Sequence, residues 1–292
     1  MRLLPLLPLA FALTTFAAAQ SSQPATGAAA RQRGYIGFDA NEYPGDAQLP
    51  LLRKQFTFTG YWLNNPPGAN HNPWLGKRDI LLRNNFGFLV VFNGRLDKEI
   101  LQARKRGKAP DALGREDAAA AIAAAHREGF PPGTILFLDQ EEGGRMLPEQ
   151  AGYLLAWTEA IAAGPYKPGV YGSGQPVPDE DEHGKHITIT TIQDLRQQVA
   201  TKHLHPIDFW VAQDACPPAP GCVIQPSHPP ALDLSGTPNA IAWQYAQSPR
   251  RPAITRSCAV TYAPDGNCYA AGLPKYQLDL SVSNSPDPSH GR

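Results

Sequence analysis

The stretch Thr134-Ile135-Leu136-Phe137-Leu138-Asp139-Gln140-Glu141 decides the fold, because it is the clearest strand pattern in the chain and ends in two carboxylates. Its apolar residues follow one another without alternation, which is typical of a strand covered on both faces in a parallel sheet. A helical pattern lies on each side of it. Residues 117–128 are rich in alanine and stop at Gly129, and residues 148–163 repeat apolar side chains at helical spacing. A strand between two helices predicts an α/β fold.

Seven further apolar runs repeat this arrangement along the chain. The expected strands, with residues 134–139 among them, are residues 35–39, 56–62, 86–92, 134–139, 169–171, 208–212, 240–245 and 276–282. Further helical patterns occupy residues 49–55, 77–84 and 191–203, whereas the segments after the sixth and seventh strands are loop-like. Eight strands over about 260 residues match a (β/α)8 TIM-barrel-like single domain. The alternative is an open doubly wound sheet, but residues 39–43 are not the glycine-rich turn that this sheet favours after its first strand.

The first residues have the layout of a secretory signal peptide. Arg2 is followed by an apolar core at residues 3–16, and Ala17-Ala18-Ala19 offers a cleavage site. The core is shorter than the ~20 residues of a membrane span, so an uncleaved anchor is the weaker alternative.

We therefore expect four segments: a signal peptide (1–19), a flexible lead-in (20–33), the barrel domain (34–284) and a disordered tail (285–292). The mature protein is then secreted, to the periplasm or the cell exterior, with no stable membrane insertion.

Four cysteines fit the same compartment. An even number of cysteines in an exported protein favours disulfides. The residues are Cys216, Cys222, Cys258 and Cys268, and of three possible pairings the local loops 216–222 and 258–268 are the simplest. A zinc site is the rival interpretation, but these spacings are not standard for zinc and no histidine lies beside either pair.

Composition and motif searches exclude several other classes of protein. The chain has 26 basic and 26 acidic residues, so it offers no strongly basic surface for nucleic acid. Gly172-Ser173-Gly174 lacks the glycine offsets of a serine nucleophile turn. His203 and His205 stand two residues apart at a helix end, a spacing that does not share one helix face for a metal. We expect no cofactor and no metal, and a monomer.

Carboxylates collect where the expected strands end. They are Asp39, Asp139, Glu141, Glu142, Asp214 and, within the last run, Asp279. In a barrel these strand ends meet at one mouth. Residues two apart in an extended chain point to the same side, so Asp139 and Glu141 form a pair. One carboxyl of such a pair can stay protonated as a general acid while the other stabilises positive charge, as glycosidic bond cleavage requires. The alternative for any single carboxylate is a helix cap or an exposed side chain.

An acidic run, Asp179 to His183, is expected to be a solvated loop inserted at residues 173–186.

Aromatic residues near the same strand ends could bind sugar rings. Tyr43, Trp62, Trp243 and Tyr245 would offer flat apolar faces, and Gln244 would offer a polar contact among them. The alternative for each ring is ordinary core or loop packing.

Four short motifs in this order resemble a known family. They are Gly37-Phe38-Asp39, Phe137-Leu138-Asp139-Gln140-Glu141, Trp243-Gln244-Tyr245 and Leu278-Asp279-Leu280. The set resembles the Rv2525c-like (DUF1906) glycoside hydrolase-like domain of secreted bacterial proteins, which is related to the family 25 lysozymes that cut peptidoglycan. The resemblance covers roughly residues 34–284 and implies a (β/α)8-like barrel with a carbohydrate-facing mouth.

The resemblance also implies roles for the carboxylates. Glu141 would protonate the leaving oxygen, and Asp139 would support the developing oxocarbenium ion or an intermediate formed by the substrate's N-acetyl group. Asp39 and Asp279 would complete the acidic ring, and cleavage would proceed with retention. Because Glu142 follows directly, the acid could instead be Glu142.

Two functions follow from the sequence. The first is a muramidase-like glycoside hydrolase acting on cell-wall glycan, with peptidoglycan as the expected partner. The second is a carbohydrate-binding barrel that has lost turnover. A hydrolase of another bond type, such as an amidase, would need a nucleophile or metal that the sequence does not offer.

Overall fold

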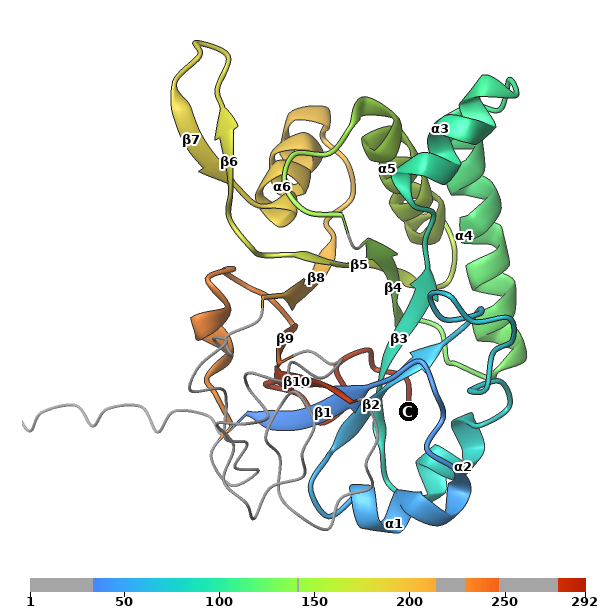
Figure 1. Cartoon of the computed structure of the whole chain (residues 1–292). Helices are drawn as coiled ribbons and strands as arrows, with labels where there is room; N and C mark the ends of the chain where they lie inside the picture. Colours follow the sequence, from blue (N-terminus) through green and yellow to red (C-terminus); the bar gives the residue numbers. More distant parts are fainter. Residues whose placement is uncertain (1–33, 141, 214–228, 247–277) are drawn as a thin grey trace, which may run out of the picture. The chain divides into compact units, whose positions relative to one another are not determined.

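A computed structural model describes residues 34–140, 142–213, 229–246 and 278–292. Eight of its strands close into a barrel in the order β1-β10-β9-β8-β5-β4-β3-β2 (Figure 1). The barrel strands are β1 (Tyr35–Asp39), β2 (Phe58–Trp62), β3 (Gly87–Asn93), β4 (Ile135–Gln140), β5 (Lys167–Ser173), β8 (Asp208–Ala212), β9 (Ala242–Ala246) and β10 (Asp279–Ser283). Each overlaps one of the eight expected runs, and the predicted barrel is confirmed.

The last strand departs from an all-parallel barrel. The pairs from β1 through β2, β3, β4, β5 and β8 to β9 are parallel, but β10 runs antiparallel to both β9 and β1. Its first residue, Asp279, therefore lies opposite Asp39, the last residue of β1. A carboxylate at the start of β10 thus reaches the same end of the barrel as carboxylates at the ends of the parallel strands.

Helices cover part of the barrel. They are α1 (Leu49–Leu52), α2 (Arg78–Arg83), α3 (Asp97–Lys105), α4 (Pro110–Arg127), α5 (Pro148–Ala162) and α6 (Thr191–Lys202), with short 3-10 turns η1 (Asp46–Gln48) and η2 (Leu232–Ser235). The helices α4 and α5 pack closely because Gly114 lacks a side chain. A Cβ added at Gly114 would lie 2.2 Å from the carbonyl oxygen of Tyr153. No described helix is long and apolar enough to cross a membrane.

The acidic insertion is not a loop throughout, which corrects the expectation for residues 173–186. It forms a two-stranded hairpin of β6 (Val177–Glu180) and β7 (His186–Ile189), paired antiparallel. Asp181 shapes the turn by accepting the backbone N–H groups of His183 and Lys185 at 2.9 Å each. The side chains at the tip remain largely exposed to solvent, so the charge run does face water.

The C-terminal residues correct the expectation of a disordered tail at residues 285–292. Ser289 donates its N–H to Phe88 O and accepts the N–H of Ile135, each at 2.8 Å. Its hydroxyl oxygen accepts the N–H of Val90, also at 2.8 Å. These partners lie at the start of β3 and β4, so the segment packs against the barrel end away from the mouth. This contact was not predictable from the sequence because the segment has little apolar character.

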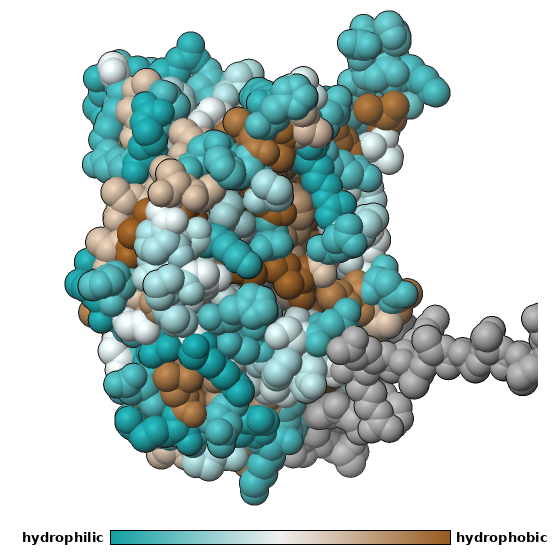
Figure 2. Space-filling view, turned by 180° about the vertical axis from the view of Figure 1, so that it is seen from behind, coloured by the Kyte–Doolittle hydropathy of each residue, from teal (hydrophilic) through white to brown (hydrophobic). Residues whose placement is uncertain are grey.

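The barrel interior is filled by aromatic side chains. The ring of Trp210 lies 5.9 Å from that of Phe137 and 4.6 Å from that of Tyr171, and its indole N–H donates to Ser281 Oγ at 3.0 Å. The outside is mostly hydrophilic on the face drawn in Figure 2, with separate small apolar areas. Scattered apolar surface of this kind is ordinary for a folded domain.

Candidate active site

Three carboxylates converge at the carboxyl end of the barrel strands. Asp39 closes β1, Asp279 faces it across the β1–β10 pair, and Asp139 lies near the end of β4. The side chains of Asp39 and Asp139 are 7% and 5% exposed. Gly60 on the neighbouring strand makes room, since a Cβ there would lie 2.6 Å from Asp39 Cβ. Three of the predicted site residues are therefore brought together.

The surroundings of Asp39 favour its protonated form. Burial raises the pKa of Asp39 well above its ordinary value, and the negative charges of Asp279 and Asp139 raise this pKa further. A hydrogen bond from Gln244 acts in the opposite direction. The like-charged carboxylates are thus close enough to act on one another, and one of them is set up to hold a proton.

Gln244 is the second residue that the structure brings to the acids. Its Nε2 lies 3.1 Å and 3.2 Å from the two oxygens of Asp39. Tyr171 donates its hydroxyl to Gln244 Oε1 at 2.7 Å, which fixes the amide with its NH2 group toward Asp39. The sequence reasoning missed Tyr171 as a site residue. Its position at the end of the fifth strand, in register with Asp139, was the available signal.

Glu141 lies outside the described residues, but its neighbour Glu142 is well defined. One carboxylate oxygen of Glu142 accepts the N–H of Asp97 at 2.9 Å, at the start of α3. The other oxygen accepts Gln140 Nε2 at 2.6 Å and Gln150 Nε2 at 3.2 Å. Glu142 therefore ties together the end of β4, the start of α3 and the first turns of α5.

A small cavity of about 140 Å³ opens beside Asp139. Its wall includes the β3–α3 connection, where the Arg95 side chain pairs with the buried Asp117 of α4. The pairing is bidentate, with Nε–Oδ2 at 2.6 Å and Nη2–Oδ1 at 2.7 Å, and Tyr153 donates its hydroxyl to the same carboxylate at 2.9 Å. This partly buried network holds one side of the mouth in place.

The four predicted sugar-stacking rings are mostly packed inside the protein. Trp62, Trp243 and Tyr245 are only 5%, 3% and 5% exposed. Trp243 and Tyr245 flank Gln244 on β9, and neighbouring strand residues point to opposite faces, so they do not share the face of Gln244. Tyr43 packs against Trp74 with ring centroids 5.1 Å apart and donates its hydroxyl to Asp46. Burial thus favours core packing for Trp62, Trp243 and Tyr245, whereas Tyr43 remains partly exposed and its role stays a prediction.

Other predicted groups take no part in the described site. The four cysteines lie outside the described residues, as does Asp214. Within the described ranges, no group of three or more His, Cys, Asp or Glu side chains is arranged to hold a metal ion.

The fold and the carboxylate cluster define a class, a closed α/β barrel with an acidic mouth. The sequence matches the family described as the Rv2525c-like, glycoside hydrolase-like domain over residues 70–248. Since that match covers more than half of the chain, the protein belongs to this family. No curated protein matches the chain.

Solved structures include similar folds. An uncharacterized Bacillus stearothermophilus protein aligns with 86% of this chain and 96% of its own, at 20% identity and a TM-score of 0.50. The catalytic domain of the endolysin ply40, from bacteriophage P40 of Listeria monocytogenes, aligns with 89% of this chain and 98% of its own, at 13% identity and a TM-score of 0.46. A family 25 glycosyl hydrolase from Bacillus anthracis aligns with 89% of this chain and 95% of its own, at 12% identity and a TM-score of 0.41.

Proposed function

We propose that this protein is an exported glycoside hydrolase that cleaves a glycosidic bond in cell-wall glycan, with peptidoglycan as substrate. The observation that carries the proposal is the cluster of the buried Asp39 and Asp139 with the partly exposed Asp279 at the carboxyl end of the parallel strands, where barrel enzymes hold their active sites. Membership of a glycoside hydrolase-like family agrees with this chemistry. Export is proposed from the signal-peptide layout of residues 1–19 and from the even number of cysteines in the sequence.

Each carboxyl group has a different role in the proposed mechanism. Glu141 is the general acid that protonates the leaving oxygen. Asp139 remains ionised and stabilises the oxocarbenium ion or the intermediate formed by the substrate's N-acetyl group. Because Asp39 favours its protonated form, it lowers the negative charge of the cluster and leaves Asp139 as a carrier of that charge.

The contacts of Glu142 support Glu141 rather than Glu142 as the acid. Both oxygens of Glu142 already accept N–H donors from three other residues. A general acid must instead be free to reach the leaving oxygen at hydrogen-bond distance. Glu142 is therefore assigned a structural task.

The test is hydrolysis of purified peptidoglycan, with the new reducing ends identified by mass spectrometry. We expect N-acetylmuramic acid at the reducing ends from the wild type, and a loss of about 100-fold or more in Glu141→Gln, the usual contribution of a general acid. Glu142→Gln is the matched control and should retain most activity if its thermal unfolding shows an intact fold.

Two results would contradict the proposal. Equal activity in Glu141→Gln and wild type would reject Glu141 as the acid. Binding of peptidoglycan by the wild type with no product at any pH would reject turnover and leave a carbohydrate-binding barrel.

A further inference from the structure

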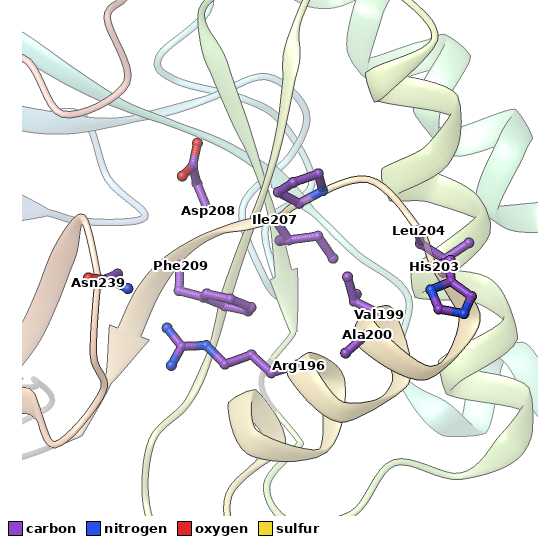
Figure 3. Close-up of a pocket in the computed structure, with 10 residues that line it drawn as sticks. Arg196, Val199, Ala200, His203, Leu204, Ile207, Asp208, Phe209 and Asn239 are labelled. Atoms are coloured by element: carbon purple, nitrogen blue, oxygen red, sulfur yellow. The ribbon is translucent and has the colours of Figure 1, made fainter.

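A second cavity lies far from the carboxylate cluster. Its volume is about 510 Å³. It is open to solvent on one side and is lined by the last turns of α6, the connection at residues 203–207, the start of β8 and Asn239 (Figure 3). Because β8 runs parallel to β4 and β5 in the barrel, its first residues lie at the end opposite to the mouth. The volume is within the range of ~300–1,000 Å³ that small-molecule sites occupy.

Apolar side chains form about half of the cavity wall. Val199, Leu204 and Ile207 are only partly buried by the core, so part of each side chain faces the cavity. Phe209 forms another part of the wall, and Ala200 is exposed on the same side of α6. A wall of this kind binds an apolar body of a ligand through removal of its surface from water.

The positively charged side chain of Arg196 lies at one end of the cavity. The guanidinium of Arg196 lies over the Phe209 ring, with 4.8 Å from Cζ to the ring centroid, and donates one hydrogen bond to the carbonyl of Pro238. Burial lowers the pKa of Arg196. None of the ion pairs among the described residues includes Arg196. Figure 3 shows that the carboxylate of Asp208 points away from the guanidinium of Arg196. Asn239 lies on the same side of the cavity as this guanidinium.

A partly buried guanidinium without a carboxylate partner, at one end of an apolar cavity, has the charge complementary to an anionic head group. Arginine has five N–H donors, and a planar carboxylate can accept two of them in parallel. We propose that this cavity binds a small monocarboxylic acid with an unbranched apolar chain. Its carboxylate contacts Arg196, and its chain lies against Val199, Leu204 and Ile207. This site is separate from the proposed hydrolysis and stands whether or not that activity is found.

Calorimetry with the full chain and monomeric hexanoate, octanoate and decanoate tests the proposal. The dissociation constant should fall about fourfold for each methylene that is buried, until the cavity is full. Octan-1-ol, which has the chain without the charge, should bind at least tenfold more weakly than octanoate.

Two variants separate the head-group contact from the cavity itself. Arg196→Met keeps an apolar stem and should weaken octanoate at least tenfold while leaving octan-1-ol within about twofold. Ala200→Trp fills the cavity from an exposed position and should remove binding of both compounds. Ala119→Trp, at an exposed alanine of α4, is its matched control and should leave binding unchanged. Thermal unfolding checks that each variant is folded.

Three outcomes would overturn the proposal. These are no binding of any carboxylate by the wild type, equal octanoate affinity in wild type and Arg196→Met, and octanoate binding that survives Ala200→Trp. Association with phosphatidylglycerol vesicles without binding of monomeric octanoate would also overturn it, and would point to a lipid surface instead.

Discussion

Asp39 shows how a residue at a functional site can oppose stability. Its carboxyl is buried beside two other carboxylates, and both burial and their charges raise its pKa. The folded state therefore binds the proton more tightly than the unfolded state does. Stability that depends on this proton is fully present below the unfolded pKa and is lost as the pH rises through the folded pKa.

Asp39→Asn should consequently stabilise the protein in alkaline solution. The amide keeps the size of the side chain but cannot ionise, so the free energy of unfolding near pH 8 should rise by about 1–3 kcal/mol. The gain should shrink toward pH 4, where the wild-type carboxyl is itself protonated. Urea unfolding at a series of pH values measures this, and a variant that is less stable than wild type near pH 8 would show that the Gln244 hydrogen bonds outweigh the burial of charge.

Tyr171 is expected to act as a positioning residue through Gln244. Tyr171→Phe removes the hydroxyl that fixes the amide, so Gln244 can turn its oxygen toward Asp39 and withdraw its N–H donors. The pKa of Asp39 should then rise further, and the pH profile of glycan hydrolysis should shift to higher pH with about a tenfold loss of rate. Tyr166→Phe is the matched control, because that hydroxyl donates to Phe130 O away from the cluster. An unchanged pH profile in Tyr171→Phe would assign Tyr171 to packing alone.

At the scale of the elements, the Arg95–Asp117–Tyr153 network joins the β3–α3 connection to α4 and α5. Asp117→Asn leaves Arg95 without its charge partner and takes an acceptor from Tyr153. Because Arg95 is partly exposed, we expect a loss of about 2–3 kcal/mol, at or below the lower end of the range for a fully buried pair.

Asp111→Asn on the same helix provides the control for that prediction. Asp111 pairs with Arg115 on the exposed face of α4, where solvent screens the charges. The unfolding midpoint of Asp111→Asn in urea should remain within error of that of the wild type. A similar small effect in Asp117→Asn would show that the network adds nothing to stability.

Some helices and strands were predictable from the sequence and others were not. The barrel strands were predictable because both of their faces are covered, which leaves continuous apolar runs such as residues 134–139. The helix α3 was missed because only Ile100 and Ala103 of its nine residues are buried, too few to give a helical period. The hairpin β6–β7 was missed because exposed residues alternate with partly or fully buried ones along it, without an apolar run.

The candidate site was predictable in part for the same reason. Strand ends converge in a barrel, so Asp39 and Asp139 were expected to meet, and they do. The direction of β10 could not be predicted from the sequence, because its apolar run is the same in either orientation. Asp279 nevertheless lies at the mouth, because β10 runs antiparallel to β1. The burial of Trp62, Trp243 and Tyr245 depends on contacts with chain segments far apart in sequence, and a pattern in one strand does not contain that information.

At the scale of the whole molecule, residues 286–292 pack against the first residues of β3 and β4, at the barrel end opposite to the mouth. Ser289 satisfies backbone groups of Phe88, Val90 and Ile135, residues that are buried in the wall. Gly87 permits the close approach, since a Cβ there would lie 2.0 Å from Pro286 O. The chain thus joins its C-terminal segment to β3, which lies 199 residues earlier at Val90, and to β4.

Removal of residues 286–292 should therefore destabilise the barrel without changing the carboxylates at its mouth, Asp39, Asp139 and Asp279. Four backbone groups, the N–H and C=O of Phe88 and the N–H groups of Val90 and Ile135, would lose their partners. At about 1–3 kcal/mol each, we expect the free energy of unfolding to fall by about 4 kcal/mol or more. Ser289→Ala removes only the hydroxyl that accepts Val90 N–H and should cost about 1–2 kcal/mol. Because the mouth lies at the other end, glycan binding by the folded fraction should keep its affinity in both variants. A truncated protein as stable as the wild type would show that water replaces Ser289 at no cost, and a graded loss in the order predicted would show that the segment is part of the barrel wall.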